Sequence, residues 1–142
     1  MKPNDKTTKI AGLMAKAKIP VDEYSLVYKI PEKINYSKPL ITILNTGDAP
    51  VKIKFFATTP KILIDQSKKD TIDADQLIID VDETHYFIVN KEDYLEYGVE
   101  IAPGAVLERW FVAYDGGECL YFTADAVGCI VRITGVENSL IG

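Results

Sequence analysis

One histidine, His85, occurs in the sequence, within the stretch ETHYFIV. A histidine acts as a general base only where a nucleophile or an orienting carboxylate converges on it in space. Neither a second histidine nor a Cys–His spacing accompanies it, so we expect a partly exposed strand residue. No set of nucleophile, base and oxyanion donors is evident elsewhere. We therefore predict a protein that is not an enzyme and has no catalytic residue.

Acidic residues gather in the stretch DADQLIIDVDE, and Ca²⁺ binds several carboxylate oxygens from one loop. Calcium-binding loops alternate acids with a glycine and end in a glutamate, whereas the apolar run QLII interrupts this stretch. We predict a solvated loop or sheet edge, with no metal and no cofactor; a metal held jointly by two subunits is the alternative. The acids are Asp73, Asp75, Asp80, Asp82 and Glu83.

Aromatic residues are frequent in the second half of the chain, and such residues can form a platform that binds carbohydrate. More often they fill a sandwich core or an oligomer interface, which is the interpretation favoured here. They are Tyr86, Phe87, Tyr94, Tyr97, Trp110, Phe111, Tyr114, Tyr121 and Phe122. Two cysteines, Cys119 and Cys129, could face each other across a hairpin, but we expect buried small hydrophobes without a disulfide.

The size and composition of the chain are those of one folded domain. It has 142 residues, 47% of them hydrophobic, and a net charge of −5. The basic residues do not gather on one segment after residue 18, which disfavours a nucleic-acid groove. We see neither a signal peptide nor an apolar run long enough to cross a bilayer, so we expect synthesis in a reducing cytoplasm and no membrane partner.

The elements that would position these residues are short strands. EYSLVYKI, PLITILN and PVKIKFFA alternate and end at turn signals, which predicts three strands in a meander. The polar segment 66–75 reads as an exposed loop. About eight to ten strands with no convincing amphipathic helix predict an all-β fold, an antiparallel β-sandwich or jelly roll over residues 21–142.

The first 20 residues differ from the rest because they show no clear alternation and carry five lysines before residue 19. We predict an extended N-terminal docking arm over residues 1–20 that makes intermolecular contacts and whose removal leaves the body stable. Lys9, Leu13 and Lys16 are its candidate interface residues.

The stretches AVLERWFVAY, ECLYFTA and CIVRITGVE predict consecutive antiparallel strands joined by hairpin turns. Alternation in the first places Leu107, Arg109, Phe111 and Ala113 on one face and Glu108, Trp110, Val112 and Tyr114 on the other. A sheet of an isolated sandwich needs only one apolar face. We therefore predict that the second face, with Trp110 and Tyr114, is covered by another subunit or a lattice.

Several stretches share an order of motifs with one known group of proteins: KIAGLMAKAKIP, LVYKIP, ITILNTGDAPVKIKFFA and the segment from YLEYGVEI to CIVRITGVE. This order resembles small virion structural proteins of tailed bacteriophages, over residues 9–57 and 94–137. It departs from them in a longer insert at 66–82 and in Pro31-Glu32-Lys33, where they usually have Pro-Ala-Gly.

The resemblance implies an external particle component, such as a head decoration (cement) protein, in the virion. It implies a closed homo-oligomer, with a trimer as the first guess, bound to major capsid or tail proteins. The alternative is a tail, neck or fibre module that binds carbohydrate or a receptor through Tyr and Trp side chains. A small hydrolase is the weakest hypothesis.

Overall fold

The computed structural model describes residues 7–32, 34–59, 63–71, 77–113 and 116–140. Strands account for most of them, and no α-helix occurs among them. The strands are β1 Thr7–Lys18, β2 Ser25–Lys29, β3 Ile34–Asn45, β4 Val51–Thr58, β5 Ile64–Asp65, β6 Leu77–Asp80, β7 His85–Val89, β8 Tyr94–Ile101, β9 Val106–Trp110, β10 Cys119–Ala124 and β11 Cys129–Leu140. Two short 3-10 helices, η1 Gln66–Thr71 and η2 Lys91–Asp93, lie between them.

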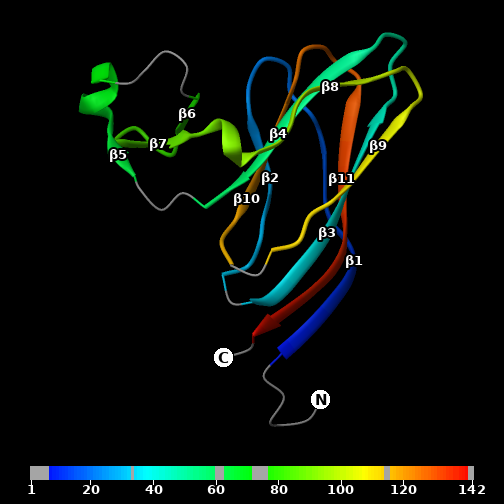
Figure 1. Cartoon of the computed structure of the whole chain (residues 1–142), viewed down its shortest axis with the longest axis horizontal. Coiled ribbons are helices and arrows are strands. Elements are labelled where there is room, and N and C mark those ends of the chain that lie inside the picture. Colours follow the sequence, from blue (N-terminus) through cyan, green and yellow to red (C-terminus); the bar gives the residue numbers. More distant parts are fainter. Residues whose placement is uncertain (1–6, 33, 60–62, 72–76, 114–115, 141–142) are drawn as a thin grey trace.

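Eight strands form two four-stranded antiparallel sheets that pack face to face (Figure 1). Sheet A has the order β1-β11-β3-β9, and sheet B has the order β2-β10-β4-β8. Successive strands alternate between the two sheets, except that β4 and β8 are neighbours in sheet B. This is the strand order of a jelly roll, a sandwich built from two Greek keys, so the predicted fold class is confirmed.

The predicted partners of the strands are wrong even where the strands themselves are right. In place of a meander, β2 and β4 lie in sheet B and β3 lies in sheet A. Likewise β9, β10 and β11 form no hairpins, because β10 pairs with β2 and β4 whereas β9 pairs with β3. The turn-prone sequences between them connect one sheet to the other. A local turn signal does not distinguish that connection from a hairpin.

The main core fills the space between the sheets with the inward side chains of alternating strands. Phe55 of β4 stacks on Phe122 of β10 with ring centroids 4.9 Å apart. Sheet A contributes the fully buried Ile41 and Ile43 of β3 and Val131 of β11. The alternation of buried and exposed residues along β4 and β9 follows from the two-residue period of a strand.

The chain between β4 and β8 contains a small third sheet, of order β5-β7-β6, which projects to one side of the sandwich (Figure 1). It packs on the outer face of sheet B through Phe87 and Val89, which form a second core with Phe56. Tyr121 stacks on Phe56 with ring centroids 5.2 Å apart. The predicted loop at 66–75 is in part the helix η1, with Ser67 and Lys68 exposed; residues 72–76 lie outside the described part.

The predicted arm is corrected in its described part. Residues Thr7–Lys18 are strand β1, which pairs with β11 along its length at the edge of sheet A. Ile19, which follows it, is 4% exposed and belongs to the main core. The boundary at residue 20 therefore does not separate an arm from the sandwich. Residues 1–6 lie outside the described residues.

Candidate functional site

The outer face of sheet A carries three rows of side chains that cross its strands. The row that ends in Trp110 is apolar apart from one threonine, and the row that ends in Val106 is apolar apart from one lysine; the row between them holds charged and polar residues. We call these residues the sheet A face: Leu13, Thr134, Leu40 and Trp110; Lys16, Arg132, Thr42 and Glu108; Lys18, Ile130, Leu44 and Val106.

The predicted alternation along β9 is confirmed for residues 107–113. Leu107, Arg109 and Phe111 are partly buried and Ala113 is buried. Glu108, Trp110 and Val112 are exposed, Trp110 to 64%. Tyr114, expected on the same face, lies outside the described residues. Trp110 is therefore not part of the monomer's core.

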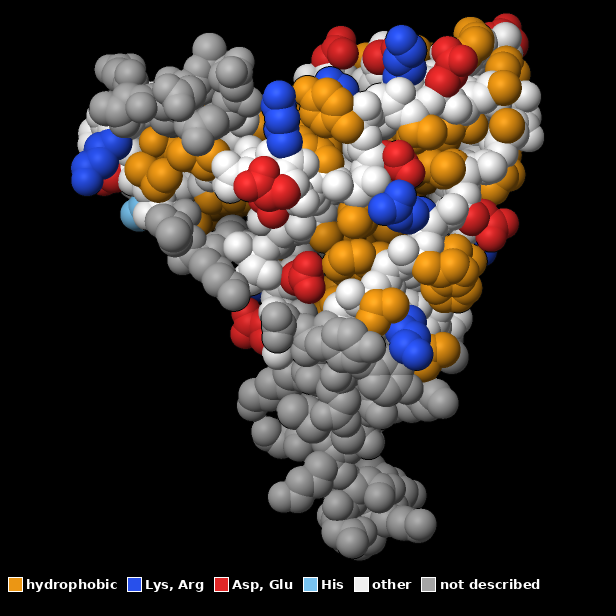
Figure 2. Space-filling model, in the orientation of Figure 1, with side chains coloured by type: hydrophobic (Ala, Val, Ile, Leu, Met, Phe, Trp, Pro, Cys, Tyr) orange, Lys and Arg blue, Asp and Glu red, His pale blue; other side chains and the backbone are white. Residues whose placement is uncertain are grey.

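Three of the predicted interface residues come together on this surface. Leu13 is 54% exposed and begins the row that ends in Trp110, and Lys16 begins the charged row. Lys9 lies in β1, but its side chain is outside the described part. Hydrophobic side chains reach the surface along the right-hand flank of the sandwich, where β9 runs, with acidic and basic side chains between them (Figure 2). Exposed apolar side chains gathered on one face, with charged side chains among them, are typical of an interaction site.

Arg109 faces inward from β9, as its position in the alternation requires. Its guanidinium donates a hydrogen bond of 2.8 Å to a carboxylate oxygen of Glu96 in β8. Because β8 and β9 are the edge strands of sheets B and A, this ion pair joins the two sheets at one open side of the sandwich. It has a structural role.

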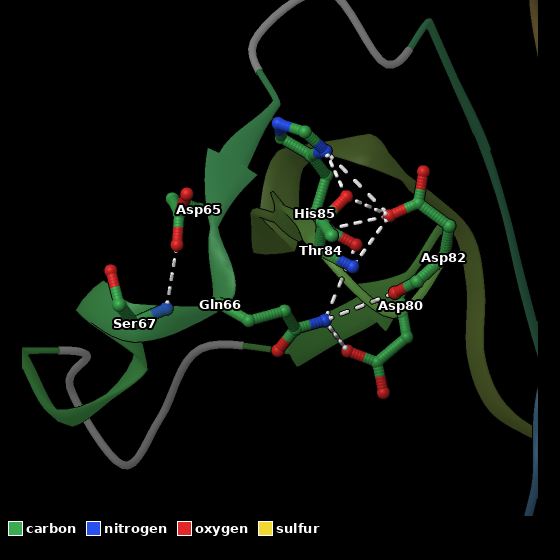
Figure 3. Close-up of polar contacts among 7 residues, drawn as sticks. All are labelled: Asp65, Gln66, Ser67, Asp80, Asp82, Thr84 and His85. Atoms are coloured by element: carbon green, nitrogen blue, oxygen red, sulfur yellow. Dashed lines mark hydrogen bonds and ion pairs between the residues drawn. The ribbon is translucent and has the colours of Figure 1, made fainter.

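His85 begins β7, is partly buried, and takes part in a tight polar turn (Figure 3). One Asp82 oxygen accepts hydrogen bonds from the Thr84 backbone N–H and hydroxyl and from the His85 backbone N–H, all within 2.8 Å. These bonds hold the pKa of Asp82 below its ordinary value. The His85 ring lies 2.7 Å from the Thr84 hydroxyl. The arrangement stabilises the turn between β6 and β7, and the expectation of a partly exposed strand residue is confirmed.

The acidic stretch provides turn and ion-pair contacts in the part that is described. Asp80 accepts hydrogen bonds of 2.8 Å from the Gln66 amide and 2.9 Å from Lys69, and these bonds lower the pKa of its carboxyl group (Figure 3 shows the first). Asp73 and Asp75 lie outside the described residues. Among the residues that are described, no group of three or more His, Cys, Asp or Glu side chains could hold a metal ion.

Both cysteines are buried and free, and they begin strands of different sheets. Burial raises the pKa of each thiol, which keeps it protonated near neutral pH. They therefore serve as small hydrophobes, as expected, and do not face each other across a hairpin.

The aromatic residues divide between cores and surface. Phe122 belongs to the main core, and Phe87 and Tyr121 belong to the second core. Tyr97 and Trp110 remain exposed, on different sheets. Tyr24, in the first half of the chain, was not among the aromatic residues singled out from the sequence. Its hydroxyl lies 2.8 Å from the hydroxyl of Tyr94, and burial chiefly raises the pKa of both phenols.

No family model and no curated protein matches the sequence. One solved structure that resembles the chain is the CBM22-1 xylan-binding domain of Paenibacillus barcinonensis Xyn10C. It has 10% sequence identity and a TM-score of 0.32, over 97% of this chain and 87% of that one. At this TM-score the likeness adds nothing to the fold assignment, which rests on the strand order of the two sheets. In the described part of the chain, no helix has the length and apolar character needed to cross a membrane.

Proposed function

We propose that this protein is a non-enzymatic structural component that assembles with copies of itself through the sheet A face. The observation that carries the proposal is the row from Leu13 to Trp110, which is apolar apart from Thr134, crosses all four strands of sheet A and is exposed at both ends. Burying such side chains against a second molecule removes apolar surface from water, which is the main driving force of association.

The charges of the same face favour a second copy as the occupant. Lys16 and Arg132 lie on the β1–β11 side of the middle row, and Glu108 lies at the β9 edge. When the β9 side of one copy covers the β1–β11 side of the next, Glu108 meets basic residues and the apolar rows meet each other. Charge complementarity of this kind selects the partner and its orientation.

The finer assignment is a decoration protein of a tailed-phage particle, made in the host cytoplasm and placed on the capsid or tail. It is supported by the resemblance of the motif order to that of such proteins and by a sandwich whose sheet A face is covered by no other element among the described residues. A trimer is the oligomer that the resemblance implies. Locating the chain in the density of an assembled particle tests this assignment.

The assembly proposal is tested by Trp110→Glu. Trp110 is largely exposed, so the variant should fold with an unchanged melting temperature, whereas a buried glutamate at the interface should disrupt the oligomer. Size-exclusion chromatography with light scattering should show an oligomer for the wild type and a monomer for the variant.

Val127→Glu is the matched control, because Val127 is also strongly exposed but lies in the turn between β10 and β11. It should retain the wild-type mass. A wild-type protein that is monomeric at all concentrations, or a Trp110→Glu variant that keeps the oligomer, contradicts the proposal.

A further inference from the structure

The outer face of sheet B has two adjoining hollows, of about 370 and 280 Å³, which share Tyr24 and Lys54 in their walls. The small third sheet lines the smaller one through Leu77 and Val89. We call the two hollows together the sheet B groove. Their volumes are close to the lower end of the range for small-molecule sites, roughly 300–1,000 Å³. The groove lies on the opposite sheet from the proposed assembly surface, so it is independent of that proposal.

Thr123, which lines the larger hollow, has a buried hydroxyl group without a partner among the described residues. Thr123 in β10 faces away from the main core, between the inward-facing Phe122 and Ala124. It is only 8% exposed, and its Oγ1 has no hydrogen-bond partner within the described residues. A buried hydroxyl without a partner is costly, and a bound polar ligand would supply the missing hydrogen bond.

Tyrosines line the smaller hollow. Tyr94 and Tyr97 come from β8, and Tyr24 precedes β2. Tyr97 is 60% exposed, and its ring packs edge-on against Tyr94 with centroids 4.8 Å apart. The hydrogen bond between the Tyr24 and Tyr94 hydroxyls holds two of the three rings in place. Exposed, fixed aromatic rings provide apolar surface together with hydroxyl groups, a combination that suits the C–H faces and hydroxyls of sugar rings.

The charges differ between the two hollows. Lys54 and Lys91 line the smaller one, and no acidic side chain is found among its described lining residues. The Lys54 ammonium lies over the Tyr97 ring, 4.5 Å from its centroid. In the larger hollow, lysines are balanced by Asp22 and Asp125. The smaller hollow therefore suits an anionic group, and the larger one suits a neutral group rich in hydroxyls.

We propose that the sheet B groove binds a short acidic oligosaccharide. A uronic-acid unit lies in the tyrosine-lined hollow with its carboxylate between Lys54 and Lys91, and a neighbouring sugar lies over Thr123. A nucleotide fits less well, because Asp22 and Asp125 would repel phosphates along the larger hollow, and the whole chain carries a net charge of −5.

Binding is tested by isothermal titration calorimetry with tetramers of galacturonate, guluronate and mannuronate and with hyaluronan tetrasaccharide. Neutral xylotetraose and cellotetraose, methyl-esterified tetragalacturonate and the four nucleoside monophosphates are included in the same panel. At least one carboxylated tetramer should bind, and its uncharged counterparts should bind about tenfold more weakly or not at all.

Three variants test the assigned residues: Tyr97→Ala, the double variant Lys54→Met/Lys91→Met, and Thr123→Val. Each should weaken binding of that tetramer about tenfold with no loss of melting temperature. Val127→Ala, at an exposed residue outside both the sheet A face and the groove lining, is the control and should bind like the wild type. The inference is overturned if no carboxylated tetramer binds, if neutral sugars or nucleotides bind as well, or if Trp110→Ala abolishes binding while the groove variants do not.

Discussion

Asn45 is a fully buried amide at the end of β3, inside the turn signal Asn-Thr-Gly-Asp. Its Nδ2 donates to the carbonyls of Ala49 and Ile101, at 2.8 and 2.9 Å, and its Oδ1 accepts from the Gly47 backbone N–H. The side chain thus takes the place of backbone partners that this turn lacks, which explains why a polar residue lies in the core.

Asn45→Ala should lower the free energy of unfolding by about 2–3 kcal/mol, because it leaves the buried Ile101 carbonyl without a partner and removes two further, part-buried hydrogen bonds, to Gly47 and Ala49. The matched control is Thr46→Ala, which removes one exposed hydroxyl bond to the Gly128 carbonyl and should cost less than about 1 kcal/mol. Urea denaturation measures both changes. Equal losses for the two variants would contradict this role for Asn45.

Cys119 and Cys129 should react with a thiol reagent only when the protein unfolds. Burial restricts access to both sulfur atoms, and the raised pKa of each thiol leaves little thiolate near neutral pH. The melting temperature should be the same with and without dithiothreitol, whereas a structural disulfide would contribute about 2–4 kcal/mol. Rapid labelling of the folded protein with Ellman's reagent would disprove the prediction.

At the scale of elements, the sandwich and the small third sheet have separate cores that meet at sheet B. Phe122 lies in the first core and Phe87 in the second. Phe122→Ala should destabilise the whole protein by about 3–5 kcal/mol. Phe87→Ala should instead release β6 and β7 from the sandwich with a smaller effect on global unfolding. Hydrogen exchange distinguishes these results, because only the second variant should expose residues 77–89 selectively.

The stability of the turn between β6 and β7 should depend on pH. Hydrogen bonds hold the pKa of Asp82 below the ordinary value of 3.8, so they stabilise the turn above about pH 4, and this contribution is lost as the pH falls through the lowered pKa. Amide resonances of residues 82–85 should therefore shift on acidification before those of the sandwich strands. Asp82→Asn keeps a turn acceptor but cannot titrate, so the acid-induced shift of the Thr84 and His85 amides that donate to this side chain should then be smaller.

The position of β1 explains the lysines at the start of the chain without a docking arm. It is the edge strand of sheet A, and its pairing with β11 shifts register between Leu13 and Ala15. Charged side chains and bulges on an edge strand protect it from unwanted pairing with other sheets. Lys16 and Lys18 are exposed, as this protection requires.

At the scale of the whole molecule, the pairing of β1 with β11 changes the effect expected from deleting residues 1–20: the deletion should destabilise the protein. Deleting residues 1–20 removes an edge strand and the buried Ile19, and uncovers the side of β11 that β1 pairs with. We expect a loss of at least about 2 kcal/mol in unfolding free energy, the cost of removing one large aliphatic core side chain. Deleting residues 1–6 is the control and should leave the melting temperature unchanged. An unaltered melting temperature after the longer deletion would restore the idea of a separate arm.

The sequence by itself determined the fold class, the positions of many turns and the two faces of β9. These properties are local: turn residues set backbone geometry within a few positions, and a two-residue period decides which side of a strand is apolar. For this reason Trp110 was correctly placed on an outer face of the sheet. That Leu13 and Lys16 lie on the same face follows only from the pairing of β1 in sheet A, and their role in an interface stays a prediction.

Only the tertiary structure decided which strands pair, where the third sheet lies and that β1 belongs to the sandwich. Strand partners depend on packing between segments far apart in sequence, and a short polar turn serves a hairpin and a crossing between sheets equally well. The alternation of small and charged residues in Ala15-Lys16-Ala17-Lys18 indicates a strand, and these residues do belong to β1. The register shift between Leu13 and Ala15 interrupts this two-residue period at Met14. The sheet B groove likewise exists only because the fold brings Tyr24, Lys54 and Thr123 from three different strands or their ends to one surface.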